Sequence, residues 1–114
     1  MFKRSKYGNK KTEMDGLKFD SKIESKRYLQ LRSMLEDGHI TELQMQVKYK
    51  LIGSQLKEDG KKERPLAYIA DFVYKVNGKT IVEDVKGMRT GEYIQKRKLM
   101  LFIHGITIKE IDKV

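Results

Sequence analysis

Two aspartates and a lysine flank an Asn77-Gly78 dipeptide in a pattern that could bind a divalent cation. Asn-Gly between two runs of β-forming residues is the strongest short signal for a two-residue hairpin turn. Such a turn fixes the strand register. Asp71 and Asp84 lie the same number of residues from the turn, so they should face each other. Lys86, two residues beyond Asp84, should lie on the same face of the sheet.

Two carboxylates in this arrangement need a positive partner. Facing residues of an antiparallel pair have Cβ atoms about 4.5–5.5 Å apart, so the two charges would repel each other. A Mg²⁺ ion would offset them, because it takes one or two carboxylates and keeps several waters. Lys86 could then orient a water for attack on a phosphate. Paired acids on a hairpin are more often simply solvated, but Ile69, Val73 and Val82 indicate a buried face, where uncompensated carboxylates are costly.

The first element expected to support this site is a helix over residues 22–37. Ser21 and Glu24 have capping-box spacing, and Gly38 is suited to the end of the helix. Glu24 borders the buried face, because it lies one turn before Tyr28 in the apolar stripe.

The rest of the chain predicts a mixed sheet with helices against it, in the order αβββαβ. Residues 41–52 alternate, which predicts a strand with Leu43, Met45, Val47, Tyr49 and Leu51 on one side. Residues 53–64 are expected to form a polar loop. The remaining predicted elements are strands over 66–76 and 79–87, a helix over 90–104 and a strand over 106–111. The crossover rule makes the last strand parallel to the strand over 79–87.

Charge and composition indicate a polyanionic partner. The chain has 25 Lys and Arg against 16 Asp and Glu, a net charge of +9. DNA is favoured over a membrane, because no segment approaches the roughly 20 apolar residues of a spanning helix and neither a lipidation signal nor a signal peptide is evident. The absence of cysteine excludes disulfides and fits a reducing cytoplasm.

The basic segment 1–18 is expected to be a loosely ordered arm ahead of a single domain over 19–114. Basic residues of the arm and of the second helix are candidates for phosphate contacts, although a solvated basic surface would look the same. These candidates are Lys3, Arg4, Lys6, Lys10, Lys11, Lys96 and Lys98.

Asp71 followed by Asp84-Val85-Lys86 resembles the PD-(D/E)XK nuclease motif, with Ala70 in place of its proline. The resemblance implies a restriction-endonuclease-like fold, metal binding by both aspartates and the Val85 carbonyl, and a lysine that assists the attacking water. Glu24, in FDSKIESKRY, matches the helix acid of transposon-end and phage Holliday-junction endonucleases, and a capping role explains it equally well. The segments KYGNKKTEMDGLKFDSKIES and YIADFVYKVNGKTIVEDVKG also resemble an uncharacterised family of small phage and prophage nuclease-like proteins.

The sequence therefore predicts a Mg²⁺- or Mn²⁺-dependent DNA endonuclease, located in the bacterial host cytoplasm if phage-encoded. The second predicted helix is rich in lysine rather than in base-reading residues, which favours junctions or flaps as substrates in recombination or DNA processing. A homodimer would suit the cutting of two strands. Two alternatives stay open: a noncatalytic nucleic-acid-binding module, and a subunit of a larger recombination or packaging assembly.

Overall fold

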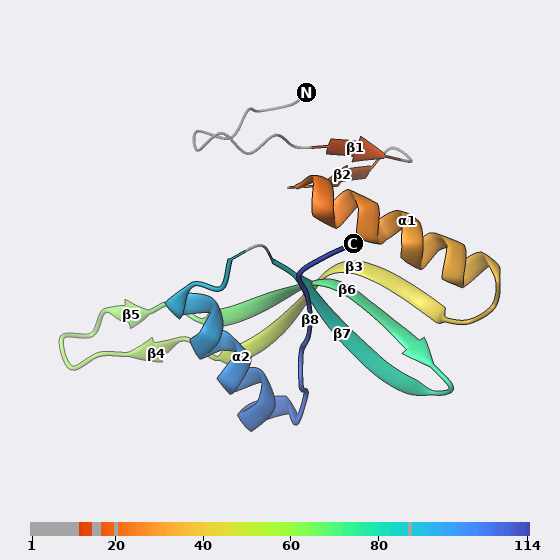
Figure 1. Cartoon of the computed structure of the whole chain (residues 1–114). Coiled ribbons are helices and arrows are strands. Elements are labelled where there is room, and N and C mark those ends of the chain that lie inside the picture. Colours follow the sequence, from red (N-terminus) through yellow and green to blue (C-terminus); the bar gives the residue numbers. More distant parts are fainter. Residues whose placement is uncertain (1–11, 15–16, 20, 87) are drawn as a thin grey trace.

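The structure, a computed structural model, describes residues 12–14, 17–19, 21–86 and 88–114 (Figure 1). Its main sheet has four strands in the order β3-β6-β7-β8. The pairs β3-β6 and β6-β7 are antiparallel, and the pair β7-β8 is parallel. The mixed α/β sheet and the parallel crossover are therefore confirmed. The strands are β3 (Thr41–Ile52), β6 (Leu66–Val76), β7 (Lys79–Val85) and β8 (Lys109–Ile111).

Both helices begin and end where the capping residues indicate. Helix α1 (Lys22–Glu36) begins after Ser21, whose hydroxyl accepts a hydrogen bond from the Glu24 amide at 3.1 Å. Helix α2 (Gly91–His104) begins after Thr90, whose hydroxyl accepts from the Tyr93 amide at 3.2 Å. Gly105 follows α2 with φ of 67°, the left-handed conformation that glycine adopts at little cost.

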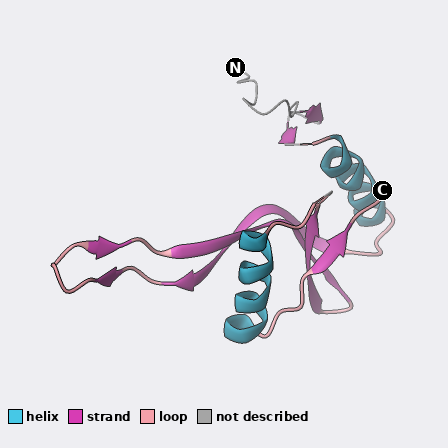
Figure 2. Cartoon of the chain, turned by 60° about the vertical axis from the view of Figure 1, so that its left-hand side comes forward, coloured by secondary structure: helices cyan, strands magenta, loops and turns pink. Residues whose placement is uncertain are grey.

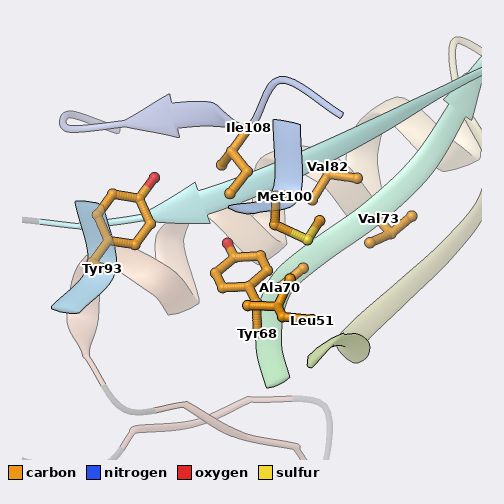
Figure 3. Close-up of a cluster of buried hydrophobic side chains, with 8 residues drawn as sticks. All are labelled: Leu51, Tyr68, Ala70, Val73, Val82, Tyr93, Met100 and Ile108. Atoms are coloured by element: carbon orange, nitrogen blue, oxygen red, sulfur yellow. The ribbon is translucent and has the colours of Figure 1, made fainter. Parts of the chain in front are cut away.

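The two helices cover opposite faces of the sheet. Strand β7 shows this directly, because Val82 packs in the cluster that contains α2 residues, whereas Ile81 and Val85 pack with α1 residues. Figure 3 shows the cluster beneath α2, formed by Leu51, Tyr68, Ala70, Val73, Val82, Tyr93, Met100 and Ile108. The cluster beneath α1 contains Tyr28, Leu31, Ile40, Phe72, Tyr74 and Val85.

Strand β3 changes faces near its middle, contrary to the uniform alternation expected from sequence. Leu43 and Met45 pack in the α1 cluster, whereas Val47 and Tyr49 pack in the α2 cluster. The change falls at Gln46, which has φ of 54°. A residue in this left-handed region interrupts the strand geometry and redirects the side chains that follow.

The same irregularity affects β6. Ala70 and Val73 belong to the α2 cluster, whereas Phe72 belongs to the α1 cluster. The alternation of side chains between the two faces of the sheet therefore shifts by one residue at Asp71. Asp71 lies opposite Gln46, because Met45 pairs with Phe72 and Val47 with Ala70. As a consequence Ile69 is 53 % exposed, and the prediction that it is buried was wrong. Val73 and Val82 are buried as expected.

Two further hairpins occupy segments for which no strands were predicted. The strands β1 (Thr12–Met14) and β2 (Leu17–Phe19) pair beside α1, so part of the expected loose arm is regular (Figure 1). The strands β4 (Gln55–Leu56) and β5 (Lys62–Glu63) extend the β3-β6 hairpin, so the expected loop is a β-hairpin (Figure 2). None of the described helices is long and apolar enough to span a membrane.

A buried ion pair joins α1 to the sheet. Arg27 donates from Nε and Nη2 to the two carboxylate oxygens of Glu83, at 2.9 and 2.6 Å. The Tyr74 hydroxyl also donates to Glu83, whose side chain is fully buried. Burial and the Glu83 hydrogen bond raise the pKa of Tyr74, so its phenol keeps the donated proton. Arg27 and Tyr74 together compensate the charge of a carboxylate that water does not reach.

Candidate active site

The hairpin register places the two aspartates as the Asn77-Gly78 turn predicts. Backbone pairing of β6 with β7 runs from Val76 and Lys79 to Phe72 and Glu83, which confirms the register. The next residues on the two strands are Asp71 and Asp84. At this point the Val85 amide donates to Asp71 Oδ2 at 2.7 Å. The Asp71 carboxylate thus accepts a hydrogen bond from a β7 amide just beyond the last backbone pair of β6 and β7.

Asp71, Asp84 and Lys86 lie on one pocket between the sheet and α2. The pocket has a volume of about 290 Å³. Lys86 faces the same way as Asp84 because side chains alternate along the chain, while Glu83 points into the α1 side. The other residues that line it are Ala67, Tyr68, Ile69, Thr90, Glu92, Tyr93 and Lys96.

Asp84 is the buried acid of this pocket, with 2 % of its surface exposed. Its Oδ2 accepts a hydrogen bond from the Tyr68 hydroxyl at 2.5 Å. Burial, followed by the bond to Asp84, raises the pKa of Tyr68, so the phenol remains a donor at neutral pH. Asp84 Oδ1 is buried and accepts no hydrogen bond from the described residues, and the Lys86 ammonium lies 3.6 Å from it. Oδ2 is therefore fixed by a hydrogen bond, whereas Oδ1 has only the positive charge of Lys86 nearby.

Lys86 is held from two directions. Its backbone amide donates to the Ile111 carbonyl at 3.1 Å, which continues the contact between β7 and β8. Its ammonium lies 5.3 Å from the centre of the Tyr93 ring, within the range of a cation–π interaction. These contacts keep a half-exposed positive charge beside Asp84, in the pocket that Asp71 also lines.

Tyr93 is fixed in turn by a group of charged residues on β8 and α2. Its hydroxyl donates to Glu110 Oε2 at 2.7 Å, and Arg97 donates to the same oxygen at 2.9 Å. Burial and the bond to Glu110 raise the pKa of Tyr93. Burial of Glu110 acts in the opposite direction, but the hydrogen bonds from Tyr93 and Arg97 lower the pKa of its carboxyl. Glu110 is thus a carboxylate that orients the ring beneath Lys86.

Glu24, which was expected to border the buried face, is itself buried, but it does not line the pocket. Its carboxylate accepts a hydrogen bond from Gln46 Nε2 at 3.2 Å, and its amide completes the helix cap. Within the described residues, no three acidic or histidine side chains form a group able to hold a metal ion. The structure therefore brings Asp71 and Asp84 together, without Glu24 as a third member of a cluster.

The basic residues predicted to contact phosphates differ in where they lie relative to the pocket. Lys96 lines the pocket and forms an ion pair with Glu92 at 3.3 Å. Lys98 is exposed on α2 and does not line the pocket. The arm candidates fall outside the described residues; these are Lys3, Arg4, Lys6, Lys10 and Lys11.

Sequence reasoning missed the two tyrosines that organise the pocket. Tyr68 lies three residues before Asp71, on the strand expected to carry that acid. A buried tyrosine needs a hydrogen-bond partner for its hydroxyl, so its place on this strand was a usable signal. Tyr93 gave a weaker signal, because its position in the first turn of α2 does not indicate which strand the ring will meet.

Fold and pocket together define an α/β protein with a pocket between the sheet and α2, built from two aspartates, a lysine and a buried tyrosine. The chain belongs to the family described as a protein of unknown function (DUF1064), whose family model matches residues 4–107. No curated protein and no solved structure matches the chain. Because this family carries no assigned activity, a functional proposal depends on the pocket itself.

Proposed function

We propose that this protein is a Mg²⁺- or Mn²⁺-dependent DNA endonuclease of the PD-(D/E)XK type. The observation that carries the proposal is the pocket shared by Asp71, Asp84 and Lys86. Two carboxylates at adjoining strand positions, with a lysine on the same face, suit phosphodiester hydrolysis better than a structural role. A purely structural pair would leave an unfavourable concentration of negative charge.

The residues of the pocket fit a hard divalent cation. Asp84 Oδ1 is a buried oxygen that accepts no hydrogen bond from the described part of the chain, and a cation would satisfy it. Asp71 is the second carboxylate, and the main-chain carbonyl of Val85, next to Asp84 in sequence, would add a neutral oxygen. Two protein carboxylates are enough for Mg²⁺, which keeps several of its waters. We therefore leave Glu24 out of the proposed metal ligands.

Each residue has a separate task in this proposal. The cation, when bound, supplies a Lewis acid and lowers the pKa of coordinated water. Lys86 holds a positive charge beside the carboxylates, where it can orient the attacking water and stabilise charge that builds on the phosphate. Tyr68 fixes the Asp84 carboxylate through Oδ2, while Oδ1 accepts no hydrogen bond from the described residues and lies 3.6 Å from the Lys86 ammonium.

Removal of the Tyr68 hydroxyl should weaken metal binding without unfolding the protein. In Tyr68→Phe the Asp84 carboxylate loses the donor that orients it, and loss of such a supporting contact typically costs about 10–100-fold in metal affinity. Calorimetric titration of Mn²⁺ into DNA-free protein measures this directly. Tyr49→Phe is the control, because Tyr49 pairs with Tyr68 across β3 and β6 but does not line the pocket. Equal Mn²⁺ affinity in Tyr68→Phe and the unmodified protein would contradict a positioning role.

DNA is the proposed substrate because of the net charge of +9 and because Lys96 adds a second cation to the pocket rim. Few residues suited to reading base edges surround the site, so recognition should depend on backbone shape. We accordingly propose a preference for junctions or flaps over linear duplex.

The test compares supercoiled plasmid, a four-way junction and linear duplex of the same composition, each with Mg²⁺, Mn²⁺ or EDTA. Cleavage should occur with either metal, stop in EDTA, and be fastest per phosphate on the junction. Cleavage that persists in EDTA would rule out the metal mechanism. Binding without any cleavage would favour a noncatalytic binding module instead. Equal rates on junction and linear duplex would refute only the structural preference.

A further inference from the structure

The β4-β5 extension, residues 53–65, projects from the sheet as an ordered hairpin (Figure 2). Its register continues that of the main sheet, because the Ile52–Leu66 pair is followed without a shift by Gln55–Glu63 and Leu56–Lys62. The turn is closed by hydrogen bonds from the Lys57 amide to the Lys61 carbonyl and from the Gly60 amide to the Lys57 carbonyl, both 2.9 Å. The extension is therefore a defined element rather than a loose loop.

This extension contributes nothing to the core. All residues from 54 to 65 are exposed, and Leu56 at the tip is 73 % exposed. An isolated two-stranded hairpin gains little stability from itself. A projecting, exposed hairpin that does not stabilise the fold is well placed to contact a partner.

The two faces of the extension differ in charge. Continuous register places Ser54 opposite Arg64 and Leu56 opposite Lys62, so one face of the paired strands carries two cations and no acid. The two acids Glu58 and Asp59 lie in the turn beyond the paired positions. The other face carries Glu63 together with Lys57 and Lys61. The face with Arg64 and Lys62 continues the side of Leu66, which packs against the cluster beneath α2. It therefore lies on the same side of the sheet as the pocket.

We infer that the Lys62/Arg64 face of the extension binds the phosphate backbone of duplex DNA that flanks the cleavage site. This inference rests on the proposed nuclease function. Lys62 and Arg64 lie nine and seven residues from Asp71 along the hairpin, and a strand rises about 3.3 Å per residue, which gives a reach of roughly 23–30 Å. At about 3.4 Å per base pair this corresponds to phosphates roughly 7–9 base pairs from the scissile bond.

The reach makes the inference testable through substrate length. Binding is measured in EDTA, so that no cleavage occurs, on DNA stem-loops of about 5 and about 24 base pairs, roughly 17 and 82 Å long, over a range of salt concentrations. The shorter stem cannot extend from the pocket to the Lys62/Arg64 face. In Lys62→Gln/Arg64→Gln the slope of log affinity against log salt should flatten by about 2 units on the long stem, at roughly 0.9 per lost phosphate contact. On the short stem the slope should not change.

Two controls match the double variant. Lys57→Gln/Lys61→Gln removes the same charge from the opposite face of the same hairpin, and Lys79→Gln removes an exposed charge at the far turn of the sheet (Figure 1). Both should change the slope by less than about 0.5 units on either stem, well under the roughly 0.9 of one contact. Similar slopes for the two hairpin double variants, or a loss independent of stem length, would overturn the inference.

Failure of the inference can be told apart from failure of the proposed function. Cleavage in Mg²⁺ by the unmodified protein, with no length-dependent slope change, would leave the nuclease proposal intact and refute the role of the extension. A length-dependent slope change without cleavage on any substrate would support a DNA-binding extension and refute the nuclease. The substituted side chains are all exposed, so thermal melting should show unchanged stability in every variant.

Discussion

Asp84→Asn is expected to lower the rate of DNA cleavage by at least about 10³-fold while leaving DNA affinity nearly unchanged. The substitution keeps the size of the side chain and an oxygen that can accept from the Tyr68 hydroxyl. It removes the charge that would hold the metal. Metal-ion catalysis contributes several kcal/mol to a reaction of this kind, and about 4 kcal/mol corresponds to 10³ in rate. Single-turnover cleavage of a junction in Mg²⁺ measures the loss.

Asp71→Asn should produce a loss of similar size, because Asp71 is the other proposed carboxylate ligand. Lys86→Ala should also abolish cleavage, but it should leave Mn²⁺ affinity in place, since the ammonium is not a ligand. Asp37→Asn is the matched control, because it removes one exposed carboxylate at the end of α1. Undiminished cleavage by both aspartate variants at the pocket would show that the chemistry occurs elsewhere.

The largest effect on stability is expected from Arg27→Ala. The Glu83 side chain is fully buried, and Arg27 supplies two of its hydrogen bonds. Removal of one partner of a buried ion pair leaves an uncompensated charge and typically costs about 3–5 kcal/mol in the free energy of unfolding. Urea denaturation followed by circular dichroism measures the change from the midpoint and slope.

Two further variants separate the buried charge from the loss of packing. Arg27→Met/Glu83→Gln removes both charges and should recover much of the stability, because a neutral amide can still pair with Tyr74. Lys75→Gln breaks the exposed pair with Glu42 at 3.2 Å and should cost less than about 1 kcal/mol. A double variant no more stable than Arg27→Ala would mean that the guanidinium matters for packing rather than for charge.

The sequence by itself determined the elements whose causes are local. Ser21 sets the start of α1, and Thr90 and Gly105 set the start and the end of α2, because each acts on backbone groups only a few residues away. The Asn77-Gly78 turn determined the β6-β7 register, and with it the neighbouring positions of Asp71 and Asp84. The two hairpins β1-β2 and β4-β5 were missed, since short polar strands carry little hydrophobic periodicity.

Only the tertiary structure decided how the pocket is completed. The left-handed Gln46 lies opposite Asp71, where the alternation of side chains along β6 shifts, and no residue near either position in sequence signals this. With this irregularity Ile69 is exposed and Tyr68 is buried. The bonds from Tyr68 to Asp84, from Tyr93 to Glu110 and from Arg27 to Glu83 join residues far apart in the chain. Such contacts follow from how strands and helices pack, which a one-dimensional pattern does not contain.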